Sequence, residues 1–285
     1  MEEIKRIAAI HDLSGFGKCS LTVALPIISA SGVECACLPT ALLSTHTGGF
    51  YDYTLKDLSD EMLPIARHWK REGLEFDGIY SGYLASARQE AMLEEIIDIL
   101  ATEKTKIIVD PVMADNGKYY SNLGDEMCRA FRRICRRAHI ITPNVTEAAL
   151  LTGLPFRMGQ HDKEYIDALS NGLSELCSGI IAITGVCPER GSVGVYAFNT
   201  QTGEECLSLR AEREGVFHGT GDIFASAFSS LMLRGAGLKE ALETAVSLVS
   251  SSIERTAERS TPRRNGVDFE SALPEYIKKV SDLFK

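Results

Sequence analysis

The chain has 285 residues, a hydrophobic content of 45%, a charged content of 24% and a formal net charge of −9. This acidic, evenly mixed composition is typical of a globular protein and argues against nucleic-acid binding. No apolar run reaches the ~18 residues of a membrane span, and the first residues lack a signal-peptide layout, so we expect a cytoplasmic protein with no membrane partner. The eight cysteines should then be reduced thiols, and the pairs Cys35/Cys37 and Cys128/Cys135 lack the double spacing of zinc sites.

Short β-rich runs alternate with helical patterns along the chain. The predicted strands cover residues 4–10, 34–38, 76–80, 106–109, 139–142, 179–184 and 194–198. The predicted helices cover residues 21–31, 59–71, 87–102, 123–137, 163–177, 221–233, 238–259 and 269–284. This alternation predicts an α/β fold with a mostly parallel central sheet and helices on both faces. No linker interrupts it, so we expect a single domain over residues 1–285.

Polar residues follow the predicted strands at their carboxyl ends. They are His11-Asp12, Ser81-Gly82-Tyr83, Asp110-Pro111, Pro143-Asn144 with Glu147 one turn later, and Thr184-Gly185. Each pair taken alone fits a helix cap, and Asn144 fits one as well as it fits a ligand. The carboxyl ends of parallel strands meet at one edge of a sheet, where open α/β folds bind their ligands. Together these residues predict a phosphate or metal site at that edge.

The segment 219-GTGD-222 precedes an apolar helical pattern. The first N–H groups of a helix lack internal partners and carry partial positive charge, and glycines allow an anion to approach the backbone closely. Gly219, Thr220 and Gly221 therefore predict a cradle for a phosphate or an oxyanion. Asp222 would repel a phosphate, but it can accept a proton from a hydroxyl that attacks one. The alternative is an ordinary helix start in a glycine-rich turn.

Two other segments favour plainer interpretations. The segment 14-SGFGKC-19 does not match a P-loop, which needs Gly where Asp12 stands and Ser or Thr where Cys19 stands. It also fails the dinucleotide-binding pattern, because Ser20 occupies the place of the third glycine. We expect a flexible glycine turn near the ligand edge. The arginine-rich segment 255-RTAERSTPRRNG-266 is more typical of a solvated loop than of a binding site.

Several motifs resemble the ribokinase superfamily: G-T-G-D before a late helix, N-x-x-E at residues 144–147 and D-P-V-M at residues 110–113. The segments 44-STHTGG-49, 81-SGYLAS-86, 110-DPVMADNGKYY-120 and 142-TPNVTEA-148 are similar to the pyridoxal kinase group in particular. The motifs occur in the family's order from Ile7 to about Ala257. Two positions depart from the family: Ala114 stands where Gly is usual, which puts the local turn in doubt, and Asp12 stands where some members carry Ser facing the pyridine ring.

The resemblance implies a ribokinase-like fold and transfer of the γ-phosphoryl group of ATP to a hydroxymethyl group on a pyridine. It implies that Asp222 is the base and that the N–H groups of Gly219, Thr220 and Gly221 hold the transferring oxygens. Mg²⁺ would be bound by Asp110 and Glu147, largely through waters, and a monovalent cation such as K⁺ is a further expectation. The residues implied along the ATP phosphates are Asp110, Asp115, Thr142, Asn144, Glu147 and Thr184.

On the substrate side, the resemblance implies that Tyr83 stacks on the ring and that Asp12 and Thr47 hydrogen-bond its polar edge. Tyr83 alone fits a half-buried aromatic, and His46, nearby, fits a structural loop histidine. We expect a homodimer acting on a small pyridine. The nearest alternative is a hydroxymethylpyrimidine kinase of thiamin synthesis, or a bifunctional enzyme, because it would share the phosphate-side motifs. A nucleotide-binding sensor would not need Asp222, and a Rossmann dehydrogenase would need a dinucleotide motif.

Overall fold

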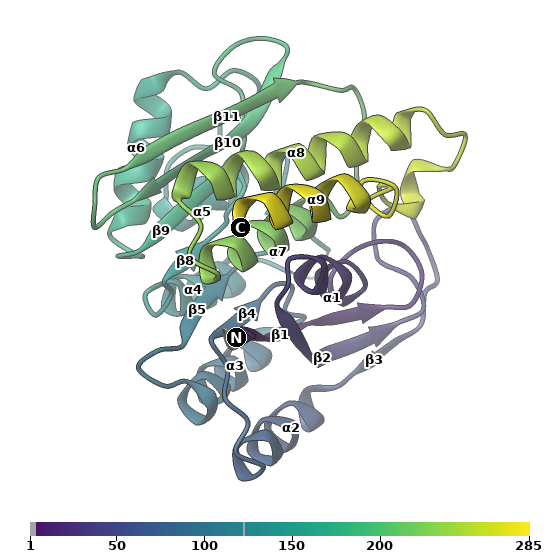
Figure 1. The fold of residues 1–285 in the computed structure, drawn as a ribbon, viewed down its shortest axis with the longest axis vertical. Coiled ribbons are helices and arrows are strands. Elements are labelled where there is room, and N and C mark those ends of the chain that lie inside the picture. The colour runs from purple at the N-terminus through teal and green to yellow at the C-terminus, as the bar shows by residue number, and fades with distance from the viewer. Residues whose placement is uncertain (1–3, 122) are drawn as a thin grey trace.

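The computed structural model describes residues 4–121 and 123–285. A nine-stranded sheet runs through the described chain in the order β11-β10-β9-β8-β5-β4-β1-β2-β3 (Figure 1). Its strands are β1 (Arg6–Ser14), β2 (Glu34–Leu43), β3 (Leu55–Asp57), β4 (Gly78–Ser81), β5 (Lys106–Val109), β8 (Ile140–Ile141), β9 (Ile180–Val186), β10 (Ser192–Asn199) and β11 (Glu205–Ala211). The short strands β6 (Ala114–Asp115) and β7 (Lys118–Tyr119) form a separate hairpin.

The central strands confirm the predicted, mostly parallel arrangement. Neighbours from β2 through β1, β4, β5 and β8 to β9 pair in parallel, whereas β3, β10 and β11 pair antiparallel at the two edges. The chain crosses from β1 to β2 on one side and reaches β4 on the other. The sheet order therefore reverses at β1, and the crevice beside such a reversal is where open α/β sheets bind ligands.

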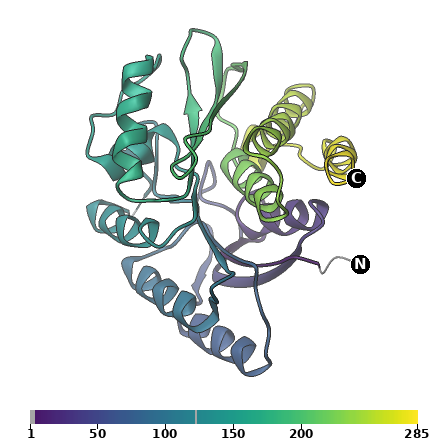
Figure 2. The ribbon, with the colours of Figure 1, turned by 60° about the vertical axis from the view of Figure 1, so that its left-hand side comes forward.

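Helices cover both faces of the sheet (Figure 2). One face carries α2 (Ser59–Arg71), α3 (Ala87–Leu100), α4 (Asp125–Cys135), α5 (Val145–Thr152) and α6 (Lys163–Ser174). The other carries α1 (Leu21–Ala30), α7 (Thr220–Leu233), α8 (Leu238–Ala257) and α9 (Leu273–Leu283). The buried faces of the helices and the sheet form two separate hydrophobic cores, and α9 packs on α8 and α1 as an outer layer.

Three sequence expectations need correction. The first strand continues to Ser14, so His11 and Asp12 lie within β1 and not after it. The hairpin β6–β7, the edge strands β3 and β11 and the helix α5 were not predicted. The segment 139–142 forms only a two-residue strand, β8. These elements are short or depend on neighbouring strands, so local periodicity carries little information about them.

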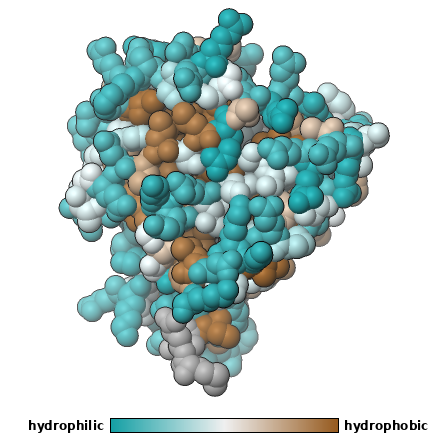
Figure 3. All heavy atoms as spheres, turned by 45° about the horizontal axis from the view of Figure 1, so that its top comes forward, coloured by the Kyte–Doolittle hydropathy of each residue, from teal (hydrophilic) through white to brown (hydrophobic). Residues whose placement is uncertain are grey.

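Outside these two cores, the side chains on the face shown in Figure 3 are mainly hydrophilic, and the hydrophobic residues form separate patches. None of the described helices combines the length and the apolar character needed to cross a membrane.

Candidate active site

The predicted polar residues gather along one edge of the sheet. Asp12 lies near the end of β1, Tyr83 follows β4, Asp110 follows β5, and Asn144 follows β8 and forms a parallel bridge with Thr184 of β9. All these strands are parallel, so their carboxyl ends face the same side. The structure therefore brings these groups together, and the N-terminus of α7 meets them there.

The segment before α7 has the backbone that the predicted cradle requires. Gly219 occupies the N-cap position with φ 85°, and no side chain caps the helix. A Cβ at Gly219 would lie 2.1 Å from the Lys18 backbone oxygen, so this position needs glycine for two reasons: its left-handed backbone and its close approach to another segment. The first amides of α7 are thus left available for an anion. The face of α7 that packs on the core contains Phe224, Phe228 and Leu231.

Two carboxyl groups near this helix start have strongly raised pKa values. Burial raises the pKa of Asp222 to about 7, with a further contribution from the charge of Asp12 and an opposing hydrogen bond from the Ser20 backbone amide. Burial raises the pKa of Asp110 to about 8, the charge of Asp222 adds to this, and the Thr142 hydroxyl opposes it by donating over 3.0 Å. These groups therefore titrate near neutral pH, where a general base is most effective.

Glu147 caps the start of α5, which the sequence indicated only as an alternative to a ligand role. Its Oε2 accepts from the Asn144 backbone amide at 2.9 Å, while Asn144 Oδ1 accepts from the Glu147 amide at 2.9 Å, which makes a capping box for α5. Its Oε1 accepts from the amides of Met113 and Ala114 at 3.0 and 3.4 Å. Asn144 Nδ2 donates to the Ala114 oxygen at 2.8 Å. Both ends of the Asn144 amide are therefore used within the protein.

The residues present fit a divalent cation. Glu147 is buried, and its pKa is raised well above the ordinary value by burial and then by the charge of Asp110. In residues 4–121 and 123–285, no lysine or arginine forms an ion pair with Asp110, Glu147 or Asp222. The same residues contain no group of three or more His, Cys, Asp or Glu side chains placed to cage a metal directly. An uncompensated pair of acids suits Mg²⁺ held mainly through waters.

The hairpin β6–β7 places Asp115 at the rim of the site. Ala114 is buried in β6, and the turn is made by Asn116 and Gly117 with φ of 50° and 75°. The departure from the family's usual glycine at Ala114 thus leaves the turn intact, because the positive φ angles fall two and three residues later. Asp115 is exposed and accepts hydrogen bonds from the backbone and side-chain amides of Asn116.

Asp12 and Tyr83 interact electrostatically at this edge of the sheet. Asp12 is 4% exposed, and its two carboxylate oxygens accept from the hydroxyls of Ser20 at 2.5 Å and Ser14 at 2.9 Å. Its pKa is raised by burial and lowered in part by these two hydroxyls. Tyr83 is half-buried, and its pKa is raised by burial and then by the charge of Asp12.

The loop with Thr47 is held by His46. Thr47 is exposed, whereas His46 is buried and accepts from the Gly48 amide through Nδ1 at 3.0 Å. With Nδ1 accepting, the remaining ring proton is on Nε2, which lies 2.6 Å from the Arg264 backbone oxygen. The structure therefore places His46 as a structural loop histidine. Its ring also lies 5.0 Å from that of His218, directly before the cradle.

The arginine-rich segment borders the site more closely than the sequence indicated. The guanidinium of Arg263 lies 4.9 Å from the Phe217 ring centroid, and that of Arg264 lies 5.0 Å from the Phe50 ring centroid. Both side chains remain exposed, as expected for a solvated loop. Their ring contacts are of the cation–π type, which adds modest stability at exposed positions. The segment thus packs against the loops that border the site.

Sequence reasoning missed Tyr120, Ser20 and Ser14. The pKa of Tyr120 is raised by burial and then by the charges of four acids, Glu147, Asp115, Asp110 and Asp222. Tyr120 is 40% exposed and lies within electrostatic range of these acids, but it follows a two-residue strand that periodicity could not reveal. Ser14 and Ser20 lie in a glycine-rich segment that matches no phosphate-binding motif, and their nearness in sequence to Asp12 is the local sign that they can donate hydrogen bonds to it.

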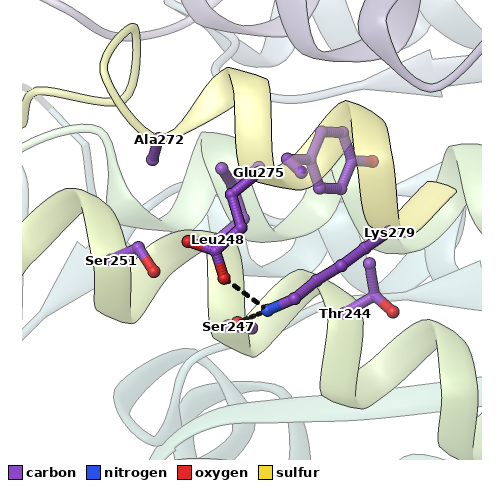
Figure 4. Close-up of a pocket in the computed structure, with 8 residues that line it drawn as sticks. Thr244, Ser247, Leu248, Ser251, Ala272, Glu275 and Lys279 are labelled. Atoms are coloured by element: carbon purple, nitrogen blue, oxygen red, sulfur yellow. Dashed lines mark hydrogen bonds and ion pairs between the residues drawn. The ribbon is translucent and has the colours of Figure 1, made fainter.

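Two hollows elsewhere contain none of the predicted site residues. A cavity of about 10 Å³ lies between α8 and α9, where Lys279 contacts Glu275 and Ser247 (Figure 4). A wider hollow of about 350 Å³ lies between α4 and α5. The first has room for about one water molecule. The open sheet edge, and not these hollows, is therefore the candidate active site.

Comparison with known proteins agrees with this geometry. The profile of the family described as phosphomethylpyrimidine kinase matches residues 25–265. The pyridoxal kinase of Ovis aries is 28% identical over 277 residues, covering 90% of this chain and 86% of that protein. A Bacteroides thetaiotaomicron structure containing pyridoxal, provisionally described as a phosphomethylpyrimidine kinase, is 35% identical with a TM-score of 0.90 over 96% of both chains. Lactobacillus plantarum pyridoxal kinase is 29% identical with a TM-score of 0.88 over 97% of this chain and 98% of that one.

The matched residues include the loop of residues 44–49, the strand ends from β4 to β9 and the start of α7. They also include the segments on which the resemblance to the pyridoxal kinases rests, and that resemblance is confirmed by the relatives. The chain is a ribokinase-like kinase and belongs to the phosphomethylpyrimidine kinase family.

Proposed function

We propose that the protein phosphorylates the 5′-hydroxymethyl group of pyridoxal, pyridoxamine or pyridoxine with ATP, as in salvage of vitamin B6. The observation that carries the proposal is Asp222, a carboxyl with a pKa of about 7 in the first turn of α7, beside the glycine-rich cradle. A protein that only binds a nucleotide gains nothing from an acid at this place, because the acid repels phosphate. A base for a hydroxyl group belongs there.

In the proposed reaction, the substrate hydroxyl oxygen bonds to the γ-phosphorus of ATP while the bond from that phosphorus to the ADP oxygen breaks. Asp222 takes the hydroxyl proton. The backbone amides of Gly219, Thr220 and Gly221 donate to the oxygens of the transferring group. Phosphoryl transfer depends on such positioning and on charge neutralisation more than on covalent catalysis. The residues of the site would supply the positioning, and a bound metal ion would supply the neutralisation.

Asp110 and Glu147 would hold Mg²⁺ through waters, and the ion would supply neutralisation of phosphate charge. Thr142 orients Asp110 through its hydroxyl, and the capping box fixes Glu147. We place the ATP phosphates along Asp115, Asn144 and Thr184 as well. Asn144 would bind by its position at the helix start, because both ends of its side-chain amide are already engaged.

The ring of the substrate would lie between Tyr83 and the loop with Thr47, with Asp12 at its polar edge. Stacking would hold the face of the ring, and hydrogen bonds would recognise its rim. The 35% identical Bacteroides structure contains pyridoxal, which supports this class of ligand. The pyridoxal kinases of Ovis aries and Lactobacillus plantarum support it by similarity.

Hydroxymethylpyrimidine phosphorylation is the second candidate, because the matching family carries that description. The two reactions share the base, the cradle and the metal site, so only the ring distinguishes them. The test is a side-by-side measurement of kcat/KM for pyridoxal, pyridoxamine, hydroxymethylpyrimidine and ribose in a coupled ATP-consumption assay. We expect the pyridines to be preferred. A preference for hydroxymethylpyrimidine would transfer the protein to thiamin synthesis, and a preference for ribose would rule out an aromatic pocket.

We further propose that a single cytoplasmic kinase domain spanning residues 1–285 acts as a homodimer. The support for a dimer is apolar exposure at one sheet edge: Leu42 of β2 and Leu55 of the edge strand β3 are 47% and 50% exposed, and Leu25 of α1 is 42% exposed. Exposed apolar side chains next to an unpaired strand favour association. Light scattering during gel filtration measures the mass, and Leu55→Lys should shift it toward the monomer.

A further inference from the structure

Ser20 has a backbone conformation that a serine rarely adopts. Its φ is 53° and its ψ is −133°, a region of the backbone map that favours glycine. Ser20 is also the N-cap residue of α1, yet its hydroxyl makes no capping hydrogen bond. Serine is a preferred N-cap because it normally makes that bond. Two local preferences are therefore broken at one buried residue, which is 5% exposed.

The contacts of Ser20 account for both departures. Its hydroxyl donates to Asp12 Oδ1 at 2.5 Å, and its backbone amide lies close enough to the carboxylate of Asp222 to stabilise the charged form and oppose the rise in pKa. One residue thus connects two acids that come from β1 and α7, more than 200 positions apart in the chain. With an ordinary φ, Ser20 would direct its backbone amide away from Asp222. If its hydroxyl capped α1, that hydroxyl could no longer donate to Asp12. Strain of this kind persists where surrounding contacts determine it, and such places are often active sites.

We propose that Ser20 is a positioning residue that holds Asp12 and Asp222 in fixed relation, so that one residue aligns the ring of the substrate with the acceptor of its hydroxyl proton. The inference rests on the proposed function. Ser14 donates to the other carboxylate oxygen of Asp12, Oδ2, at 2.9 Å, and within the described chain it forms no hydrogen bond with Asp222. When it is ionised, the Asp12 carboxylate can only accept hydrogen bonds. The substrate group that faces Asp12 must then be a donor, such as a protonated ring nitrogen or a hydroxyl.

Three variants separate the parts of this arrangement. Ser20→Ala removes the hydroxyl bond that holds a residue with a side chain in the strained region, so we expect its backbone to relax and to turn the amide away from Asp222. Ser20→Gly also removes the hydroxyl but adopts φ 53° without strain, so its amide stays directed at Asp222. Ser14→Ala is the matched control, because it removes the other hydroxyl from Asp12 and no contact to Asp222. All three should raise KM for the pyridine and leave KM for ATP unchanged.

The turnover number distinguishes the variants. Ser20→Ala should lower kcat by about 10- to 100-fold, the scale of a small misplacement of reacting groups. Ser20→Gly and Ser14→Ala should lower kcat less, because both keep the amide on Asp222. Ser20→Gly should also melt at a higher temperature than Ser20→Ala. Kinetic constants for Ser20→Ala within twofold of wild type would overturn the proposal, and so would equal losses of kcat in all three variants.

A readout without phosphoryl transfer keeps the inference separate from the proposed function. The carboxyl carbon of Asp12, labelled with ¹³C, reports its titration by NMR. Loss of the Ser20 hydroxyl should raise the Asp12 pKa, since that hydroxyl stabilises the charged form. The titratable groups around Asp12 are His11, Cys19, His46, Tyr83 and Asp222. The Ser20→Ala substitution replaces none of these residues.

The two experiments give distinguishable failures. If the wild-type protein prefers another substrate but Ser20→Ala raises the Asp12 pKa, the proposed function fails and the connection made by Ser20 stands as a property of the site. If the wild-type protein phosphorylates pyridoxal but Asp12 titrates identically in Ser20→Ala, the proposed function stands and the role assigned to Ser20 is wrong.

Discussion

His46 Nε2 lies 2.6 Å from the backbone oxygen of Arg264, which ties the loop bearing Thr47 to the turn after α8. A Gln at position 46 can place its amide nitrogen near Nε2 and keep this bond, whereas an Asn can replace only the Nδ1 acceptor. We expect His46→Asn to raise KM for the pyridine by about tenfold, the effect of losing about 1.4 kcal/mol. His46→Gln should stay near wild type. Equal kinetics for both variants would mean that the bond does not order the loop.

Asp222→Asn should lower kcat by about 10²- to 10⁴-fold, the usual contribution of a general base. Affinity for ATP should hold or improve, because a charge that repels phosphate is removed. Steady-state kinetics together with calorimetric titration of ATP measures both quantities. Turnover within about threefold of wild type would remove Asp222 from the role of base, whatever its position.

The raised pKa of Asp222 predicts two opposite pH dependences. The base must be ionised, so kcat/KM should rise with pH and level off above about 7. Stability should change in the other direction. Between the ordinary carboxyl pKa and 7, the folded state binds the proton that the unfolded state has released, so the free energy of unfolding falls as pH rises. Asp222→Asn should therefore melt at a higher temperature than wild type at pH 8, by about 2 °C or more, with little difference at pH 4.

Glu147→Gln should raise the Mg²⁺ concentration needed for half-maximal rate, because one negative member of the outer shell is lost. The structure adds a second effect. Glu147 accepts from the amides of Met113, Ala114 and Asn144, and an amide side chain can replace only part of these bonds. We therefore expect a lower melting temperature as well, and the Mg²⁺ titration must be made where the variant is folded. An unchanged Mg²⁺ requirement in a destabilised variant would make Glu147 a capping residue alone.

Tyr83→Ala should raise KM for the pyridine about tenfold while KM for ATP stays nearly constant, since the two substrates would meet only at the transferring phosphate. The stacking contribution expected for one aromatic pair is about 0.5–1.5 kcal/mol, and the lost area adds to it. Tyr83→Phe is the control, because it keeps the ring and removes only the hydroxyl. If Phe and Ala raise KM equally, the hydroxyl and not the ring face recognises the substrate.

Much of this architecture was determined by the sequence alone. The strand predicted over residues 106–109 is β5 with the same bounds, and the helix predicted over residues 59–71 is α2 with the same bounds. Apolar runs and helical periodicity report these elements directly, because burial of their apolar faces drives their formation. The Gly219–Asp222 segment is also readable locally, since glycine before an apolar helix implies an open helix start. The parallel orientation of the central strands then follows from the alternation of strands and helices, and with it the meeting of polar groups at one edge.

Only the tertiary structure decided how the groups at that edge are held. The hydroxyl of Ser20 reaches Asp12 and its amide reaches Asp222, although no local pattern connects these positions. His46 depends on the carbonyl of Arg264, which lies 218 residues away. Tyr120 comes within electrostatic range of four acids only because the β6–β7 hairpin folds back beside the strand ends. Sequence patterns report which residues are apolar along one element. Hydrogen-bond partners and the burial of charged groups depend instead on elements that are far apart in the chain. Those partners and that burial set the pKa values on which the chemistry depends.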